Sequence, residues 1–282
     1  MMDINFLKQN GVDVDKSLEL FGDIGTYNDT IGDFLVSVND KVPKLQAYKI
    51  AKDMPNYAIY AHSIKSDARY FGFTKLGEMA YEHELKSKAG DIYYIFENYD
   101  NFIAEINKTA DLVKKYLEGT PADAISQPTE TETVEAAPTT TDVIVEEQEG
   151  EIYDRQTILV VDDSNIIRNF VSRIFKDTYN VGIAKDGKEA IDIIDANTMN
   201  NNIKAILLDL NMPKVDGFAV LDHMKENDLF DKIPVSIISG DSSKDTIDRA
   251  FTYTIVDMLG KPFNEADVKR VVEKTVYSKE LA

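Results

Sequence analysis

The stretch TILVVDD, at residues 157–163, decides the fold of the C-terminal half. A threonine and four apolar residues run without a break and end in two acids, which is typical of a strand buried on both faces of a parallel sheet. Strands and helices then alternate to the end of the chain, and this alternation predicts an α/β, doubly wound, five-stranded parallel sheet with helices on both faces at residues 153–282. We expect further strands near 181–184, 205–208, 235–238 and 255–259, and helices at 165–175, 187–196, 218–227, 244–252 and 265–278.

Polar side chains follow four of these strands directly. Asp162 and Asp163 end the first, Asp209 the third, Ser239 the fourth and Lys261 the fifth. In doubly wound sheets ligands bind at the carboxyl ends of the strands. A lone aspartate there would be read as a solvated surface residue, but five polar groups together indicate a site. Three converging carboxylates repel one another unless a divalent cation lies among them, and their hard oxygen ligands suit Mg²⁺.

The same residues carry a family resemblance. The stretches LVVDDS (159–164), LLDLNMPKVDG (207–217), ISG (238–240) and GKPF (260–263) are similar to those of a response-regulator receiver domain, over residues 157–279. The resemblance implies a flavodoxin-like fold in which a carboxylate accepts a phosphoryl group. It assigns Asp209 as the phosphoacceptor, Asp162, Asp163, Asp209 and the Asn211 backbone carbonyl as Mg²⁺ ligands, Ser239 as the switch hydroxyl and Lys261 as the phosphate-sensing base, and it implies a cis Lys261–Pro262 bond.

One position departs from the receiver pattern. Where receivers usually carry an aromatic residue three positions before the lysine, this chain has Met258. A methionine fills gaps but cannot act as a hydroxyl-bearing rotamer switch. The departure leaves the phosphorylation chemistry intact and puts the usual coupling to a partner surface in question.

Residues 1–118 have a helical period throughout. Apolar residues recur at spacings of three and four, and short connections between the segments favour antiparallel packing. The pattern predicts an all-α helical bundle with helices at 17–21, 27–38, 44–52, 55–71, 74–88 and 92–117.

One helix of this bundle presents a histidine. His62, Lys65, Ser66 and Arg69 share one helical stripe, so we expect an exposed imidazole with a basic neighbour. A histidine near its ordinary pKa is largely neutral at pH 7 and therefore nucleophilic, and Lys65 could balance the charge of an attached phosphoryl group.

The histidine stretch also carries a resemblance. AHSIKS (61–66), with Gly72 ten residues after His62, resembles the histidine phosphotransfer (HPt) signature, and the similarity extends over about residues 3–118. It implies that His62 is phosphorylated. His83 and His223 are interpreted as structural residues, although Lys86 follows His83 at the same spacing as Lys65 follows His62.

The two halves are joined by an acidic segment. Residues 119–152 contain nine acidic and no basic residues, are rich in Pro, Thr and Glu, and show no periodicity. Such a composition predicts a disordered linker, which would allow His62 and Asp209 to meet within one chain at an effective concentration of up to about a millimolar. The net charge of −19 without a basic stripe argues against nucleic-acid binding. The absence of cysteines, signal peptide and long apolar run indicates a cytoplasmic protein without membrane insertion.

These features predict a phosphorelay intermediate. The sequence has no glycine-rich phosphate loop and no room for an ATP-binding domain between its halves, so phosphate should come from a sensor or hybrid histidine kinase, or from other receiver or HPt proteins. An alternative is an adaptor whose receiver binds a target when phosphorylated while the HPt half drains the phosphate. A fragment of a chemotaxis-type kinase is disfavoured because the ATP-binding and dimerisation segments are missing.

Overall fold

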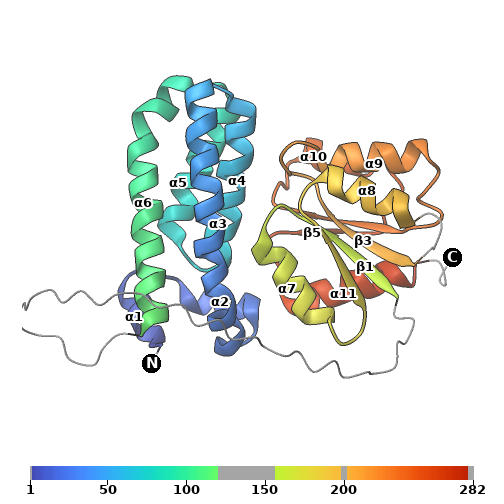
Figure 1. Cartoon of the computed structure of the whole chain (residues 1–282), viewed down its shortest axis with the longest axis horizontal. Coiled ribbons are helices and arrows are strands. Elements are labelled where there is room, and N and C mark those ends of the chain that lie inside the picture. Colours follow the sequence, from blue (N-terminus) through green and yellow to red (C-terminus); the bar gives the residue numbers. More distant parts are fainter. Residues whose placement is uncertain (1, 120–155, 198–201, 279–282) are drawn as a thin grey trace, which may run out of the picture.

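The computed structural model describes residues 2–119, 156–197 and 202–278, which form two domains packed side by side (Figure 1). The predicted linker, 119–152, lies outside the described residues except for Gly119. No helix in the described part of the chain is long and apolar enough to cross a membrane.

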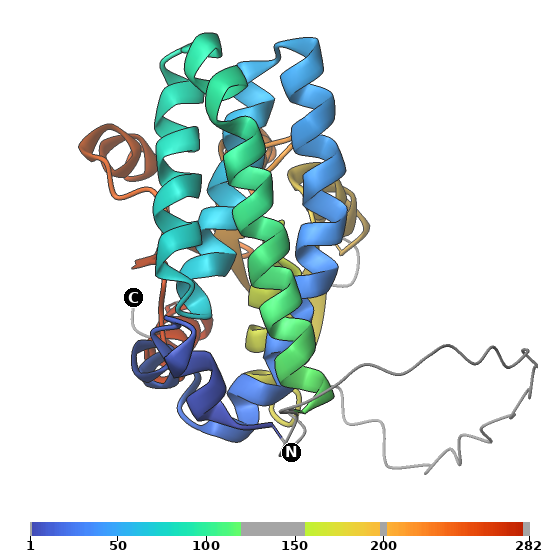
Figure 2. The ribbon, with the colours of Figure 1, turned by 90° about the vertical axis from the view of Figure 1, so that its left-hand side faces the viewer.

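The N-terminal domain is the predicted helical bundle. Four long helices pack along one another, and two short ones lie at one end (Figures 1 and 2). Aspartates at positions 23, 53 and 91 cap three of the long helices, each accepting a hydrogen bond from a backbone N–H of the first turn. The helices are α1 (Ile4–Gln9), α2 (Val14–Phe21), α3 (Ile24–Ala51), α4 (Met54–Tyr70), α5 (Thr74–Lys88) and α6 (Ile92–Glu118).

Helix α3 corrects the sequence prediction. Two helices, 27–38 and 44–52, were expected, but α3 runs unbroken through Pro43, and α1 was not predicted. Proline inside a helix costs about 3 kcal/mol because it removes a hydrogen bond and crowds the preceding turn. The buried stripe of Ile31, Phe34, Val38 and Leu45 continues across Pro43. Burial of this face outweighs the local preference for a break.

The C-terminal domain confirms the predicted doubly wound fold. Its five parallel strands have the order β2-β1-β3-β4-β5. Helices α7 and α11 cover one face of the sheet, and α8, α9 and α10 the other (Figure 1). The elements are β1 (Thr157–Val161), α7 (Asn165–Phe175), β2 (Asn180–Ala184), α8 (Gly187–Asn197), β3 (Ile203–Asp209), α9 (Gly217–Glu226), β4 (Val235–Ser239), α10 (Lys244–Ala250), β5 (Met258–Gly260) and α11 (Glu265–Val276).

An apolar seam joins the two domains. The Phe21 ring of α2 meets the Phe170 ring of α7 edge-on at 5.7 Å, and the Tyr70 ring at the end of α4 meets that of Phe263 at 5.8 Å. The Phe263 backbone N–H donates to the Tyr70 hydroxyl at 3.2 Å. Helix α4 is therefore covered by the bundle on one side and by the C-terminal domain on the other, and from Tyr60 to Ala68 every residue is buried.

Candidate functional site

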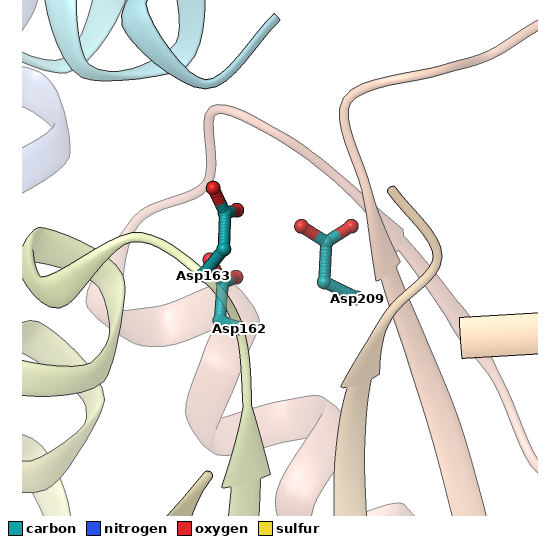
Figure 3. Close-up of side chains that lie close together, drawn as sticks. All are labelled: Asp162, Asp163 and Asp209. Carbon is teal, nitrogen blue, oxygen red and sulfur yellow. The ribbon is translucent and has the colours of Figure 1, made fainter. Parts of the chain in front are cut away.

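The carboxyl ends of the strands form an acidic crevice. Asp162 and Asp163 directly follow β1, and Asp209 is the last residue of β3. One oxygen from each of the three carboxylates lies within 4.8 Å of the others, and Figure 3 shows the side chains side by side. Asp162 and Asp209 are buried, whereas Asp163 is partly exposed. The parallel register of β1 and β3 brings these residues together although 46 positions separate Asp163 from Asp209.

Lys261 lies at the same edge, one residue beyond β5. Its Nζ is 2.6 Å from Asp162 Oδ2 and 2.7 Å from Asp209 Oδ2. Burial alone would lower the pKa of Lys261, but the neighbouring carboxylates raise it above its ordinary value. Burial raises the pKa of Asp209 to about 7, although Lys261 acts in the opposite direction. One ammonium thus partly neutralises three carboxylates, and the crevice keeps an affinity for further positive charge.

Ser239 and Asn211 complete the rim of the crevice. The Ser239 hydroxyl, at the end of β4, donates to the Asp241 carbonyl at 3.2 Å and accepts from the Asp241 N–H at 3.1 Å. The Asn211 backbone N–H donates to Asp209 Oδ1 at 3.1 Å. The Lys261–Pro262 peptide bond is cis, as expected. Met258, at the usual aromatic position, is partly buried at the margin of the apolar core between the sheet and helices α8 and α9.

His62 lies on α4 with its two ring nitrogens in different surroundings. Its Nδ1 is 2.8 Å from Glu84 Oε1 on α5, and its Nε2 has no hydrogen-bond partner among the described residues. A carboxylate can only accept, so the 2.8 Å contact with Glu84 favours the tautomer with the proton on Nδ1 and the lone pair on Nε2, over the longer approach of Lys65 Nζ at 3.1 Å. Burial lowers the pKa of His62 below 6.5, and Glu84 partly offsets this shift. The ring is therefore held in its neutral form.

The C-terminal domain covers this nucleophile. His62 is only 3% exposed, which corrects the expectation of an exposed ring. A Cβ at Gly240, the residue after Ser239, would lie 2.8 Å from His62 Nε2. His62 and Asn211 also line one cavity of about 290 Å³ between the domains. The nucleophilic nitrogen is buried against the rim of the acidic crevice and not inside the bundle.

A hydroxyl of the bundle reaches the crevice directly. Ser63, next to His62 on α4, donates to Asp163 Oδ2 at 2.6 Å. Sequence reasoning missed both Ser63 and Glu84. Ser63 is an ordinary polar residue of the helix until the other domain is in place, and Glu84 lies on a different helix, 22 positions from His62. No spacing within one element could have indicated either contact.

The other predicted residues of the α4 stripe divide between two environments. Lys65 is buried and paired with Glu84 Oε2 at 2.6 Å, with its Nζ 3.1 Å from His62 Nδ1. Ser66 is buried, and Arg69 is exposed. Lys65 and Lys261 both line a narrow crevice at Gly240. The positive charge expected beside His62 is present, but it is held by a carboxylate of the bundle.

The two remaining histidines lie elsewhere. His83 is inside the bundle, with Nδ1 2.9 Å from the Tyr57 hydroxyl and its ring stacked on Phe102 at 4.3 Å. Burial lowers the pKa of His83 to about 4. His223, on α9, pairs with Asp195 at 2.7 Å. Neither histidine adjoins the acidic crevice.

Comparison with known proteins identifies the C-terminal domain. The sequence profile described as the response regulator receiver domain matches residues 158–273. Over 120 residues the chain is 31% identical to the two-component response regulator ORR3 of Oryza sativa, covering 42% of this chain and 89% of that protein. The chain belongs to the response-regulator receiver family. A second relative of this receiver is the probable methanogenesis regulatory protein FilR2 of Methanothrix harundinacea, 33% identical over 129 residues, with coverage of 44% and 83%.

Solved structures match the receiver as well. The receiver domain of a putative Luxo repressor protein from Vibrio parahaemolyticus is 27% identical, with a TM-score of 0.41, and the match covers 45% of this chain and 94% of that one. A CheX–CheY–BeF3–Mg complex from Borrelia burgdorferi is 26% identical, with a TM-score of 0.40 and coverage of 45% and 90%. The relatives named as two-component regulators connect the chain with two-component signalling.

Replacing Glu84 with glutamine should lower the pKa of His62 further, because the carboxylate that stabilises the imidazolium is lost while Lys65 remains. NMR titration of the imidazole resonances measures this shift, with His83 as an internal reference. Glu82→Gln, on the exposed side of the same helix, is the matched control and should leave the titration of His62 unchanged. A rise in the pKa of His62 in Glu84→Gln would contradict the assigned role of Glu84.

Proposed function

We propose that this chain is a phosphorelay protein in which phosphoryl groups pass between His62 and Asp209. The observation that carries the proposal is the unpartnered Nε2 of His62, buried against Gly240 at the rim of the crevice that contains Asp209. His62 shares an interdomain cavity with Asn211, two residues from Asp209, and Glu84 contacts the opposite ring nitrogen.

The transfer is a displacement at phosphorus. The Nε2 lone pair of His62 attacks the aspartyl phosphate, a P–N bond forms, the P–O bond to Asp209 breaks, and the carboxylate leaves with the bonding electrons. The imidazole becomes positively charged, and Glu84 stabilises this charge through Nδ1–H. Lys261 and the Ser239 hydroxyl are placed to stabilise the oxygens of the moving phosphoryl group. The reverse reaction uses the same groups.

The acidic crevice fits a magnesium ion. Three carboxylates with oxygens within 4.8 Å share one ammonium, so the set has a formal excess of negative charge that a dication would neutralise. Asp162, Asp163, Asp209 and the Asn211 carbonyl would hold it, and their hard oxygens suit Mg²⁺. Bound there, the ion would supply charge neutralisation where phosphate meets a carboxylate.

The phosphate should come from partner proteins. The sequence contains no glycine-rich phosphate loop, and relatives such as ORR3 are named as two-component response regulators. Sensor or hybrid histidine kinases, and other receiver or HPt proteins, are the classes that supply or accept phosphoryl groups in such systems. HPt function of the bundle rests on the geometry of His62.

Labelling the full chain with [³²P]acetyl phosphate and Mg²⁺ should place phosphate first on Asp209 and then on His62. Alkali removes acyl phosphates and spares phosphohistidine, so it separates the two products. Alkali-stable label should form in the wild-type chain and in the matched control His83→Gln. It should be absent from His62→Gln, which cannot accept, and from Asp209→Asn, which cannot be loaded.

Two results would contradict the proposed transfer. The first is a wild-type chain whose label is removed completely by alkali. The second is alkali-stable label that persists in His62→Gln.

Asp163→Asn should weaken Mg²⁺ binding by at least about tenfold, because one of three ligand carboxylates loses its charge. Isothermal titration with MgCl₂ measures the dissociation constant. Asp186→Asn is the control, because Asp186 lies in the neighbouring loop and pairs with Lys214 at 2.6 Å. Equal affinity in Asp163→Asn and the wild-type chain would remove Asp163 from the ligand set.

A further inference from the structure

We propose that this chain selects its own receiver as the partner of His62, over other receivers, through the side-chain-free position at Gly240 and the polar face of α7. The proposal rests on the phosphotransfer function above and adds the determinants of partner choice. Two independent groups of contacts carry it.

Gly240 is a glycine for a steric reason. Its backbone is not in the left-handed region that favours glycine, so its φ would allow other residues. An added Cβ would lie 2.8 Å from Nε2 and 3.0 Å from Cε1 of His62, with Ser66 Oγ next at 3.6 Å. Apart from the adjacent Ser239 and Asp241, no described residue of the receiver comes closer to that position. The missing side chain therefore makes room for the imidazole of the bundle.

A receiver with any side chain at this position would hold the imidazole away from the crevice. Displacing the attacking atom of a transfer by about 1 Å can reduce its rate by about 100-fold. Gly240 thus discriminates between receivers by the distance that it allows between Nε2 and the phosphoryl group.

The second group of contacts joins α3 to α7. Asn169 Nδ2 donates to Asp33 Oδ2 at 2.9 Å, and Asn165 Nδ2 lies 3.5 Å from the Asp33 carbonyl. Helix α7 lies beside α3 (Figure 1), and the contacts place both donors on its side toward α3. Asn169 meets the Asp33 carboxylate, and Asn165 meets the Asp33 backbone carbonyl. A receiver with an acid at the position of Asn169 would be repelled.

Asp67 extends this recognition to Ser164, the N-cap residue of α7. Its Oδ1 accepts from Ser164 Oγ of the receiver at 2.8 Å. Its Oδ2 accepts from Ser37 and is 2.6 Å from Lys41 Nζ, both on α3. Asp67 is 1% exposed, so a receiver without a donor here would leave a buried carboxylate oxygen unsatisfied. Ser164, Asn165 and Asn169 form one row of donors on the receiver.

The steric determinant is tested with Gly240→Ala in the full chain. The rate at which alkali-stable label forms from acetyl phosphate gives the transfer rate. This rate is divided by the rate at which Asp209 is phosphorylated. The phosphorylation of Asp209 is measured separately in His62→Gln chains with and without Gly240→Ala. The normalised rate should fall by about 10- to 100-fold. Gly260→Ala is the matched control, because a Cβ there meets nothing within 4 Å. An unchanged normalised rate in Gly240→Ala would overturn the steric part of the proposal.

The polar determinant is tested by charge exchange between two copies of the chain. Acceptors carry Asp209→Asn and donors carry His62→Gln, so label passes only from one copy to the other. An acceptor with Asp33 should take phosphate about tenfold faster from a donor with Asn169 than from one with Asn169→Asp, because like charges then face each other. An acceptor with Asp33→Asn should lose or reverse this preference.

The readout is the ratio of the transfer rates from the two donors to the same acceptor. Every acceptor keeps its own receiver packed against His62, so its overall rate also depends on how readily that receiver moves away, and the ratio cancels this effect. Equal rates from both donors to the Asp33 acceptor would overturn the polar part of the proposal. If even the wild-type chain forms no alkali-stable label, the phosphotransfer function fails instead. The two failures are therefore distinguishable.

Discussion

Burial of helix α4 between two domains is the constraint on which the rest of the structure depends. The Tyr70–Phe263 and Phe21–Phe170 ring contacts fix the distance between the bundle and the receiver. The middle of α4 is buried, and buried polar groups need hydrogen-bond partners, some of which lie in the other domain. Ser63 and Asp67 do so with Asp163 and Ser164. The apolar seam thus holds the two domains close enough for these polar contacts to form.

The same burial gives His62 its chemical character. A ring out of contact with water is held neutral, and Glu84 directs its lone pair by occupying the opposite nitrogen. The neighbouring acidic crevice has the opposite charge balance, because its three carboxylates outnumber the ammonium of Lys261. Under the proposed function, the neutral imidazole would donate its lone pair to phosphorus at this crevice.

The fold of the receiver could be predicted from sequence, since the expected helix 165–175 coincides with α7 and the polar residues stand at or directly after the ends of their strands. The carboxyl ends of parallel strands meet at one edge of a sheet. The sequence positions of Asp162, Asp209 and Lys261 were therefore sufficient to predict that these side chains lie together. The bundle was harder to predict. Pro43 indicates a break between two helices, but the burial of Phe34 and Leu45 keeps α3 continuous. The contact of His62 with Glu84 joins two helices, and no periodicity within one helix contains that information.

By itself, the sequence determined the two fold classes and the acidic crevice and singled out His62 as the candidate histidine, because each follows from residue type and spacing within single elements. Only the tertiary structure decided that His62 is buried, which of its nitrogens is free, and that Gly240 and α7 meet the bundle. The free nitrogen follows from Glu84, 22 positions from His62, whereas the burial of His62 and the contacts of Gly240 and α7 arise from residues about 100 to 180 positions apart. The interdomain surfaces exist only after both domains have folded and packed, because the side chains that form them are not neighbours in the sequence.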